Sequence, residues 1–264
     1  MNDQPDVKPT AIRAGDVTAP IYNLSLEELG ELEQGLIAIA EQAAAGSDFV
    51  GVWIHPDSKF ANFARTHEAS YFPEVAEVSP QTEASTRFLV LVDTRPENRR
   101  VVHAATVTGL EQAEDGAETT GFNVVDELIA AGNFTADEFR QFYRQRKLEL
   151  SKSIAVETNF RIGEKVVGPD GIPTSYLVYL ALFSLVKQGG AAIDQAAVFA
   201  TLNDLQVNSF ERFGLDFEPM MGRTDLSTPE AELGRTSLPV AIIYNAKAEA
   251  LFGALPIELP VLMI

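Results

Sequence analysis

The chain has 264 residues, of which 46% are hydrophobic and 22% charged, and 38 acidic residues outnumber 20 basic ones, for a net charge of −18. This composition is ordinary for a globular protein with a sizeable core, and the negative charge disfavours nucleic acid and anionic membranes as partners. The sequence contains no cysteine, which excludes disulfides, thiolate metal sites and a cysteine nucleophile.

The N-terminal segment, residues 1–24, contains proline, aspartate and glycine and shows little periodicity. We therefore predict a flexible N-terminal arm, followed by a single domain over residues 25–264. The segment lacks the basic stretch and apolar run of a secretory signal. The longest apolar run, residues 176–186, is too short to span a bilayer. We expect a soluble cytoplasmic protein with no membrane span.

A capping-box pattern begins the first predicted helix. The Ser25 side chain can accept the backbone N–H of Glu28, whose carboxylate can reach back. An apolar stripe then continues towards Gly46, where the helix should end. Residues 49–54 predict a short strand, and Asp57 is expected to cap a second short helix.

The middle of the chain predicts a hairpin. Residues 87–93 and 101–109 are apolar strand segments joined by a polar turn, which is typical of an antiparallel pair. Residues 111–118 hold four acidic and no basic side chains and are expected to form a solvated loop. Residues 124–131 predict a short helix.

A second capping box, formed by Thr135 and Glu138, predicts the next helix. Helical spacing directs its aromatic side chains inward and brings Arg140, Arg144 and Lys147 together on one face.

The C-terminal half alternates strands and helices, with a glycine-containing loop after its first strand. The patterns predict strands at residues 153–161, 192–199, 215–218 and 238–245, a buried helix at 176–187 and an amphipathic helix at 202–213.

With the hairpin before it, this order resembles that of the GNAT N-acyltransferases, and within them the acyl-homoserine-lactone synthase and long-chain N-acyl amino acid synthase branch. Three local segments carry the resemblance, which spans about residues 50–245. The Arg65-Thr66-His67-Glu68 segment before Tyr71 looks like an early arginine-containing segment of that branch. AVETNFR, residues 155–161, is similar to its Glu-x-Ser-Arg strand, and RFGLDFE, residues 212–218, resembles its R-x-G-F-x-F ending.

The resemblance implies an α/β (α+β) fold of GNAT type, with a mixed, twisted sheet flanked by helices. It also shows departures from the family pattern. Asn159 stands where the branch has serine, Arg161 is displaced by one position, and the usual pyrophosphate signature is absent in strict form. These departures favour an acceptor amine other than that of the lactone synthases.

The activity that the resemblance implies is transfer of an acyl group from acyl-CoA or acyl-carrier protein to an amino acid-like amine, by direct attack. The acyl thioester would be a co-substrate, and no permanently bound cofactor or metal is expected. Three scattered histidines give no metal-binding spacing. The alternative is a catalytically inactive GNAT-like module that binds an acyl ligand or a protein.

The resemblance also implies where the thioester lies. The end of a strand and the start of the following helix would form its cradle, at Phe160, Arg161, Gly163, Thr174, Ser175 and Tyr176. Asn203 and Asn208 would line the pantetheine arm from the next helix. The alternative to the cradle is an ordinary glycine loop, and the alternative for the two asparagines is surface polarity.

The resemblance also implies catalytic roles for a few charged residues. Glu157 could act as general base, with Arg161 nearby, or could form a structural ion pair. Arg65 and Glu68 could orient an acceptor carboxylate, or could form a surface pair.

The basic face of Arg140, Arg144 and Lys147 is the last candidate site. It could dock a carrier protein or hold the phosphates of CoA. It could equally be a solvated helix face that balances nearby acids.

Overall fold

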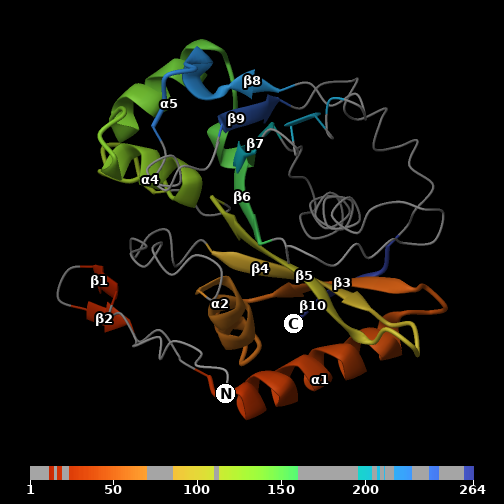
Figure 1. Cartoon of the computed structure of the whole chain (residues 1–264). Helices are drawn as coiled ribbons and strands as arrows, with labels where there is room; N and C mark the ends of the chain where they lie inside the picture. The colour runs from red at the N-terminus through yellow and green to blue at the C-terminus, as the bar shows by residue number, and fades with distance from the viewer. Residues whose placement is uncertain are drawn as a thin grey trace.

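The computed structural model describes residues 12–14, 17–19, 24–69, 86–109, 113–159, 196–203, 207–208, 211, 217–227, 238–243 and 259–264. Its centre is a mixed sheet in the order β10-β3-β4-β5-β6-β7-β9-β8, shown in Figure 1. The β10–β3 and β6–β7 pairs are parallel and the other pairs are antiparallel. The predicted mixed α/β architecture is confirmed.

The strands of this sheet are β3 (Phe49–Ile54), β4 (Arg87–Asp93), β5 (Arg100–Thr108), β6 (Ile154–Asn159), β7 (Ala197–Leu202), β8 (Glu218–Pro219), β9 (Leu238–Ile243) and β10 (Val261–Met263). The described helices are α1 (Leu26–Ala43), α2 (Ala61–Ala69), α4 (Asn123–Ala130) and α5 (Ala136–Gln145), with short 3₁₀ turns η1 (Leu150–Lys152) and η3 (Met220–Gly222). A separate antiparallel pair, β1 (Ile12–Ala14) and β2 (Val17–Ala19), lies near the N-terminus.

Helices pack on the sheet through two hydrophobic clusters. The first cluster joins α1 and α2 to β3, β4 and β5, with Leu36, Phe60 and Val90 among its buried members. The second joins α4 and α5 to β6, β7 and β9 and includes Phe139 and Phe199. Figure 1 shows the two helix pairs beside the two halves of the sheet. Burial of these apolar side chains is the main stabilising term for such a fold.

A β-bulge in β5 keeps the members of the first cluster on one face of the sheet. The register of β4 and β5 shifts by one residue between Leu91 and Val92, so Val101 and Ala104 are both in the first cluster despite their odd spacing. Further along β5, Thr108 lies opposite Ala155 of β6, which belongs to the second cluster. Without the extra residue, the odd spacing would turn Val101 to the opposite face from Ala104.

Both predicted capping boxes are confirmed. The Glu28 N–H donates to Ser25 Oγ at 3.2 Å, and the Ser25 N–H donates to Glu28 Oε2 at 2.8 Å. At the start of α5, the Thr135 N–H donates to Glu138 Oε2 at 2.7 Å, and the Glu138 N–H returns to Thr135 Oγ1 at 3.2 Å. Each box satisfies two N–H groups that a helix start otherwise leaves without partners.

Several predicted boundaries need correction. Asp57 does not cap α2, because the helix begins at Ala61 and Ser58 makes the turn before it: the Ser58 carbonyl accepts the Ala61 N–H at 2.9 Å. The strand predicted at 192–199 is β7, which extends to Leu202. The predictions missed β10, a three-residue strand.

The helix predicted at 176–187 and residues 192–195 lie outside the described residues. The division into arm and single domain stays a prediction.

Gly109 ends β5 at a point where no side chain fits. Its φ is +89°, and a Cβ built on it would lie 2.2 Å from Cε1 of Phe122. Phe122 is buried between α4 and the sheet, where its ring lies 5.2 Å from that of Phe199, measured between centroids. The absence of a side chain at Gly109 therefore allows the chain to turn directly over the second cluster.

We predict that Gly109→Ala lowers the free energy of unfolding by about 3 kcal/mol, because it adds overpacking to backbone strain. Gly116→Ala is the matched control, since Gly116 has a φ of +84° with no atom within 4 Å of the built Cβ. That control should cost only about 1 kcal/mol, the strain alone. Urea denaturation measures both, and equal losses in the two variants would contradict the packing account.

Both capping glutamates should titrate below the ordinary value of 4.5. The Ser25 hydroxyl, followed by its N–H, lowers the pKa of Glu28, and the Thr135 N–H, followed by its hydroxyl, lowers the pKa of Glu138. Each carboxylate therefore stabilises the fold above pH 4.5, and this contribution is lost as the pH falls through the lower folded-state pKa. Carboxyl-detected NMR should show that Ser25→Ala raises the pKa of Glu28 alone; a parallel rise at Glu138 would be inconsistent with local capping.

Candidate functional site

The parallel strands β6 and β7 are paired at one end and separate at the other. The Ala196 N–H donates to the Lys152 carbonyl at 3.0 Å, and the ladder continues through Ile154–Val198 and Ala155–Phe199. No further β6–β7 pair forms among the described residues, although β6 continues to Asn159 and β7 to Leu202. Each strand stays paired with its outer neighbour over that stretch, β6 with β5 and β7 with β9. The sheet therefore opens between β6 and β7 towards their C-terminal ends.

Beyond the last pair, the main-chain groups of β6 that would continue the ladder have no β7 partner among the described residues. A parallel pair forms evenly spaced hydrogen bonds along its length, and β6 has four residues, Val156 to Asn159, beyond its last pairing with β7. A buried N–H or C=O group needs a partner. An extended ligand that carries amide groups, lying between the two strands, would supply partners of the right kind.

Glu157 lies within this stretch of β6. It is directly opposite Thr106 of β5 in the antiparallel ladder. Thr106 is 7% exposed, which makes it one of the few buried polar residues in the sheet. The prediction from sequence missed Thr106, since it is one of two threonines in the strand Val101–Gly109 and shows no feature other than high β-propensity. Thr106 is therefore a buried polar residue directly across the ladder from Glu157.

Arg65 and Glu68 lie on α2. Arg65 Nη1 donates to the Pro56 carbonyl at 3.4 Å and to Asn62 Oδ1 at 3.5 Å, and its guanidinium carbon lies 5.1 Å from the centre of the Phe88 ring. These contacts fix the arginine against the first cluster. The backbone of Glu68 is helical, and its side chain lies outside the description.

The two asparagines occupy different settings. Asn203 follows β7 directly and is not within a helix, which corrects the prediction, and its carbonyl accepts the Val207 N–H at 2.9 Å. Asn208 is helical and exposed. The other cradle candidates, Phe160, Arg161, Gly163, Thr174, Ser175 and Tyr176, lie outside the described residues, so their roles stay predictions.

Solved structures similar to this chain include two of one enzyme. No protein-family model matches the chain, and no curated protein matches it. Both structures are of BjaI, described as a CoA-dependent acyl-homoserine lactone synthase, one with SAM and isopentyl-CoA and the other with MTA. Each is 13% identical to this chain, with a TM-score of 0.47, over 82% of this chain and 93% of the BjaI chain.

The predicted basic face does not form as expected. Arg140 is 5% exposed, and its guanidinium donates to the carbonyls of Ala117, at 3.0 Å, and of Thr119. Arg144 is paired with Asp115. Lys147 lies beyond the end of α5, with a φ of +60°. The acidic loop is therefore held by α5, and two of the three cations serve this purpose.

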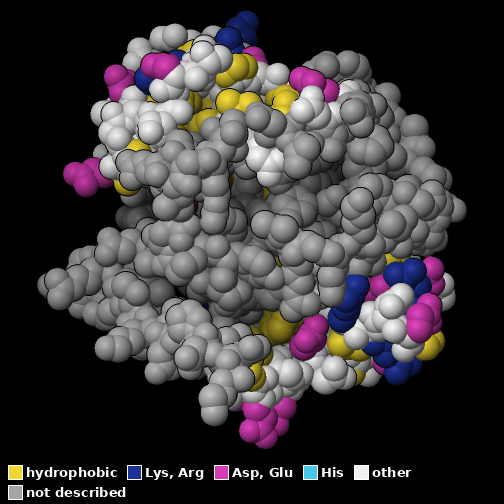
Figure 2. Space-filling view, viewed as in Figure 1, with side chains coloured by type: hydrophobic (Ala, Val, Ile, Leu, Met, Phe, Trp, Pro, Cys, Tyr) yellow, Lys and Arg dark blue, Asp and Glu magenta, His cyan; other side chains and the backbone are white. Residues whose placement is uncertain are grey.

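Charged side chains also meet at the β4–β5 turn. Figure 2 shows basic and acidic side chains gathered over this turn and the end of α1, at the lower right. Arg95 Nη2 lies 2.6 Å from Asp93 Oδ2, and Arg99 Nε lies 2.6 Å from Glu41 Oε1. Hydrogen bonding to Asp93 raises the pKa of Arg95. These pairs neutralise much of the positive charge on this surface.

The described part of the chain contains neither a metal-binding cluster nor a membrane-spanning helix. No group of three or more histidine, cysteine, aspartate or glutamate side chains is arranged there to hold a metal ion. None of the helices described is both long enough and apolar enough to cross a bilayer.

We predict that Arg140→Met lowers the free energy of unfolding by about 2–3 kcal/mol, because it leaves backbone carbonyls without donors in a buried setting. Arg144→Met should cost less than about 1 kcal/mol, as an exposed ion pair contributes little. Urea denaturation of the two variants checks this. Similar small losses in both would mean that Arg140 is not the anchor of the loop.

Proposed function

We propose that this protein is an acyltransferase that moves an acyl group from an acyl thioester, acyl-CoA or acyl-carrier protein, to an amine. The opening between β6 and β7 carries the proposal, because it places main-chain hydrogen-bonding groups where the ladder ends after Ala155 and Phe199. The pantetheine arm of such a thioester is extended and contains two amides. It can pair with these strands much as an added strand pairs with a sheet edge.

The donor would continue from the strands into the loop that follows β6. Phe160, Arg161 and Gly163 would provide main-chain N–H groups for the pantetheine. Thr174, Ser175 and Tyr176 would begin a helix whose N-terminus receives the pyrophosphate, since a helix N-terminus favours anions. Because the net charge is −18, the proposal relies on local main-chain N–H groups and a helix N-terminus to hold the anion.

Chemistry at the opening would proceed without an acyl-enzyme. The neutral amine nitrogen attacks the thioester carbonyl carbon to give a tetrahedral oxyanion, after which the C–S bond breaks and the thiolate takes up a proton. Glu157 would accept the proton lost by the amine, directly or through water. Thr106, opposite Glu157 in the ladder, would position that carboxylate or water. Arg161, which follows β6 in the sequence, would assist this proton transfer.

Acceptor binding is proposed for the α2 side of the opening. Arg65 and Glu68 would orient the carboxylate and ammonium of an amino acid-like acceptor, three residues apart on one helix. The burial of Arg140 favours free acyl-CoA over a carrier protein as donor. The basic face that was predicted to dock a carrier protein loses one of its three cations when Arg140 is buried.

CoA and acyl-CoA binding is the first test. We expect CoA and a series of acyl-CoA thioesters to raise the melting temperature, and mass spectrometry to find N-acyl products with an amino acid panel. No shift with any of these ligands would overturn the proposal. Stabilisation without turnover of any acceptor would identify the inactive acyl-binding module instead.

Glu157→Gln tests the base. We expect it to lower kcat by about 10²–10⁴-fold, the usual contribution of a general base, while CoA still stabilises the variant. Glu114→Gln, in the exposed loop before α4, is the control and should leave kcat unchanged. Thr106→Val should lower kcat and Thr106→Ser should restore it, because serine keeps the hydroxyl. Unchanged turnover in Glu157→Gln would contradict the role of this carboxylate.

A further inference from the structure

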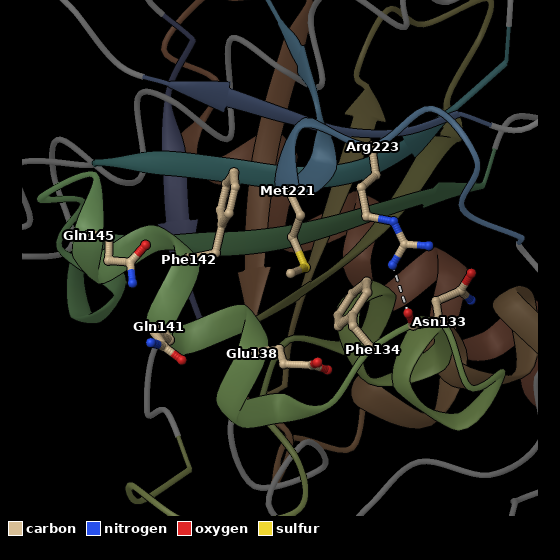
Figure 3. A pocket seen from close by; sticks show the side chains of 8 residues that line it. All are labelled: Asn133, Phe134, Glu138, Gln141, Phe142, Gln145, Met221 and Arg223. Atoms are coloured by element: carbon tan, nitrogen blue, oxygen red, sulfur yellow. Dashed lines mark hydrogen bonds between the residues drawn. The ribbon is translucent and has the colours of Figure 1, made fainter.

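A second site lies away from β6 and β7, on the outer side of α5. A pocket of about 360 Å³ forms between α5 and η3. Its apolar part comes from Phe134, Phe142 and Met221, and its polar part from side chains that include Glu138 and Gln141. Figure 3 shows Met221 between the two phenylalanine rings, with the Glu138 carboxylate on the α5 side. This volume is at the lower end of the range for small-molecule sites.

The backbone holds Met221 in an uncommon conformation. Its φ is +55° and ψ is +20°, the left-handed region that favours glycine. Its N–H donates to the Tyr143 hydroxyl at 3.0 Å, and Tyr143 is fully buried with its pKa raised by burial to about 12. A fixed hydroxyl partner therefore keeps the Met221 side chain at the pocket in spite of the strain.

The charges around the pocket are not balanced. Arg223 is bound by Asp225 through Nε and Nη2, each at 3.0 Å, and donates through Nη1 to the Asn133 carbonyl at 2.8 Å. Glu138 uses Oε2 in the capping box. The Thr135 hydrogen bonds, and after them the nearby Arg223 charge, lower the pKa of Glu138, but Arg223 makes its direct contacts with Asp225 and Asn133. An anion would meet a guanidinium that already has a carboxylate, whereas a cation would meet the free oxygen of Glu138.

We propose that this pocket binds a small organic cation with an apolar body, such as an arylalkyl ammonium ion. The apolar body would contact Phe134, Phe142 and Met221, and the ammonium would donate to Glu138. The chain's net charge of −18 adds long-range attraction for a cation.

This ligand would not be the amine that is acylated. The inner side of α5 presents Phe139 and Tyr143 to Phe199 of β7, with ring centroids 5.1 Å apart in both pairs. The body of α5, about 10 Å across, therefore separates the pocket from the strands. The site is independent of the proposed acyl transfer.

Methionine methyl NMR gives a direct test, because the chain has four methionines and Met221 lines the pocket while Met263 lies on β10. Titration with phenethylammonium chloride should shift the Met221 methyl resonance saturably and leave that of Met263 in place. The neutral isostere 2-phenylethanol should bind at least about fivefold more weakly, the effect expected of one partly exposed charge pair. Equal affinity for the two probes, or no shift at Met221, would overturn the proposal.

Two capping glutamates supply a matched pair of variants. Glu138→Gln removes the charge but keeps a capping-box side chain, and Glu28→Gln makes the same change at the start of α1, away from the pocket. We expect Glu138→Gln to weaken phenethylammonium binding about fivefold and Glu28→Gln to leave it unchanged. Equal weakening in both variants would mean that binding depends only on the net charge of the protein, and it would overturn the proposed site.

Discussion

The contact of Phe199 with three other aromatic rings is the constraint on which the second half of the fold depends. Its ring centroid lies 5.2 Å from that of Phe122 and 5.1 Å from those of Phe139 and Tyr143. Phe199 is also the last residue of β7 that pairs with β6. The aromatic cluster from α4 and α5 therefore fixes β7 at the point where the two strands begin to separate. Edge-to-face packing of this kind is directional, so it holds position as well as burying area.

This arrangement explains how a sheet can open without losing its core. On one side of Phe199 the backbone ladder and the aromatic cluster close the structure. On the other side each strand keeps its outer neighbour, and only the β6–β7 hydrogen bonds are given up. Glu157 lies two residues beyond Ala155, the last β6 residue in the ladder. A rigid closed end next to an open end provides preorganised geometry for a ligand, which is what a catalytic site requires.

Local patterns predicted the elements well, and tertiary contacts explain what they missed. Ser25 and Thr135 begin their helices because a capping box needs only neighbours in sequence. Residues 87–93 form the predicted strand because all but Arg87 are buried. The three residues of β10 give too short a pattern, and they are a strand because β3 pairs with them. Helical spacing placed Arg140 on a solvated face, whereas the carbonyls of a distant loop draw it inward. For the candidate site, the sequence predicted that Glu157 lies on a central strand. It could not show where the β6–β7 ladder ends or that Thr106 lies opposite Glu157, because both depend on the register between strands.

The edge formed by β8 has a consequence for how the protein behaves in concentrated solution. An open sheet edge can recruit a strand from another molecule and so start aggregation. Among the described strands β8 forms one border of the sheet, and it has only two residues, of which Pro219 has no N–H to offer. Its other residue, Glu218, is paired with Arg146 and adds charge to the same border. Sheet extension across this border is therefore disfavoured by chain length, by a missing donor and by charge at once.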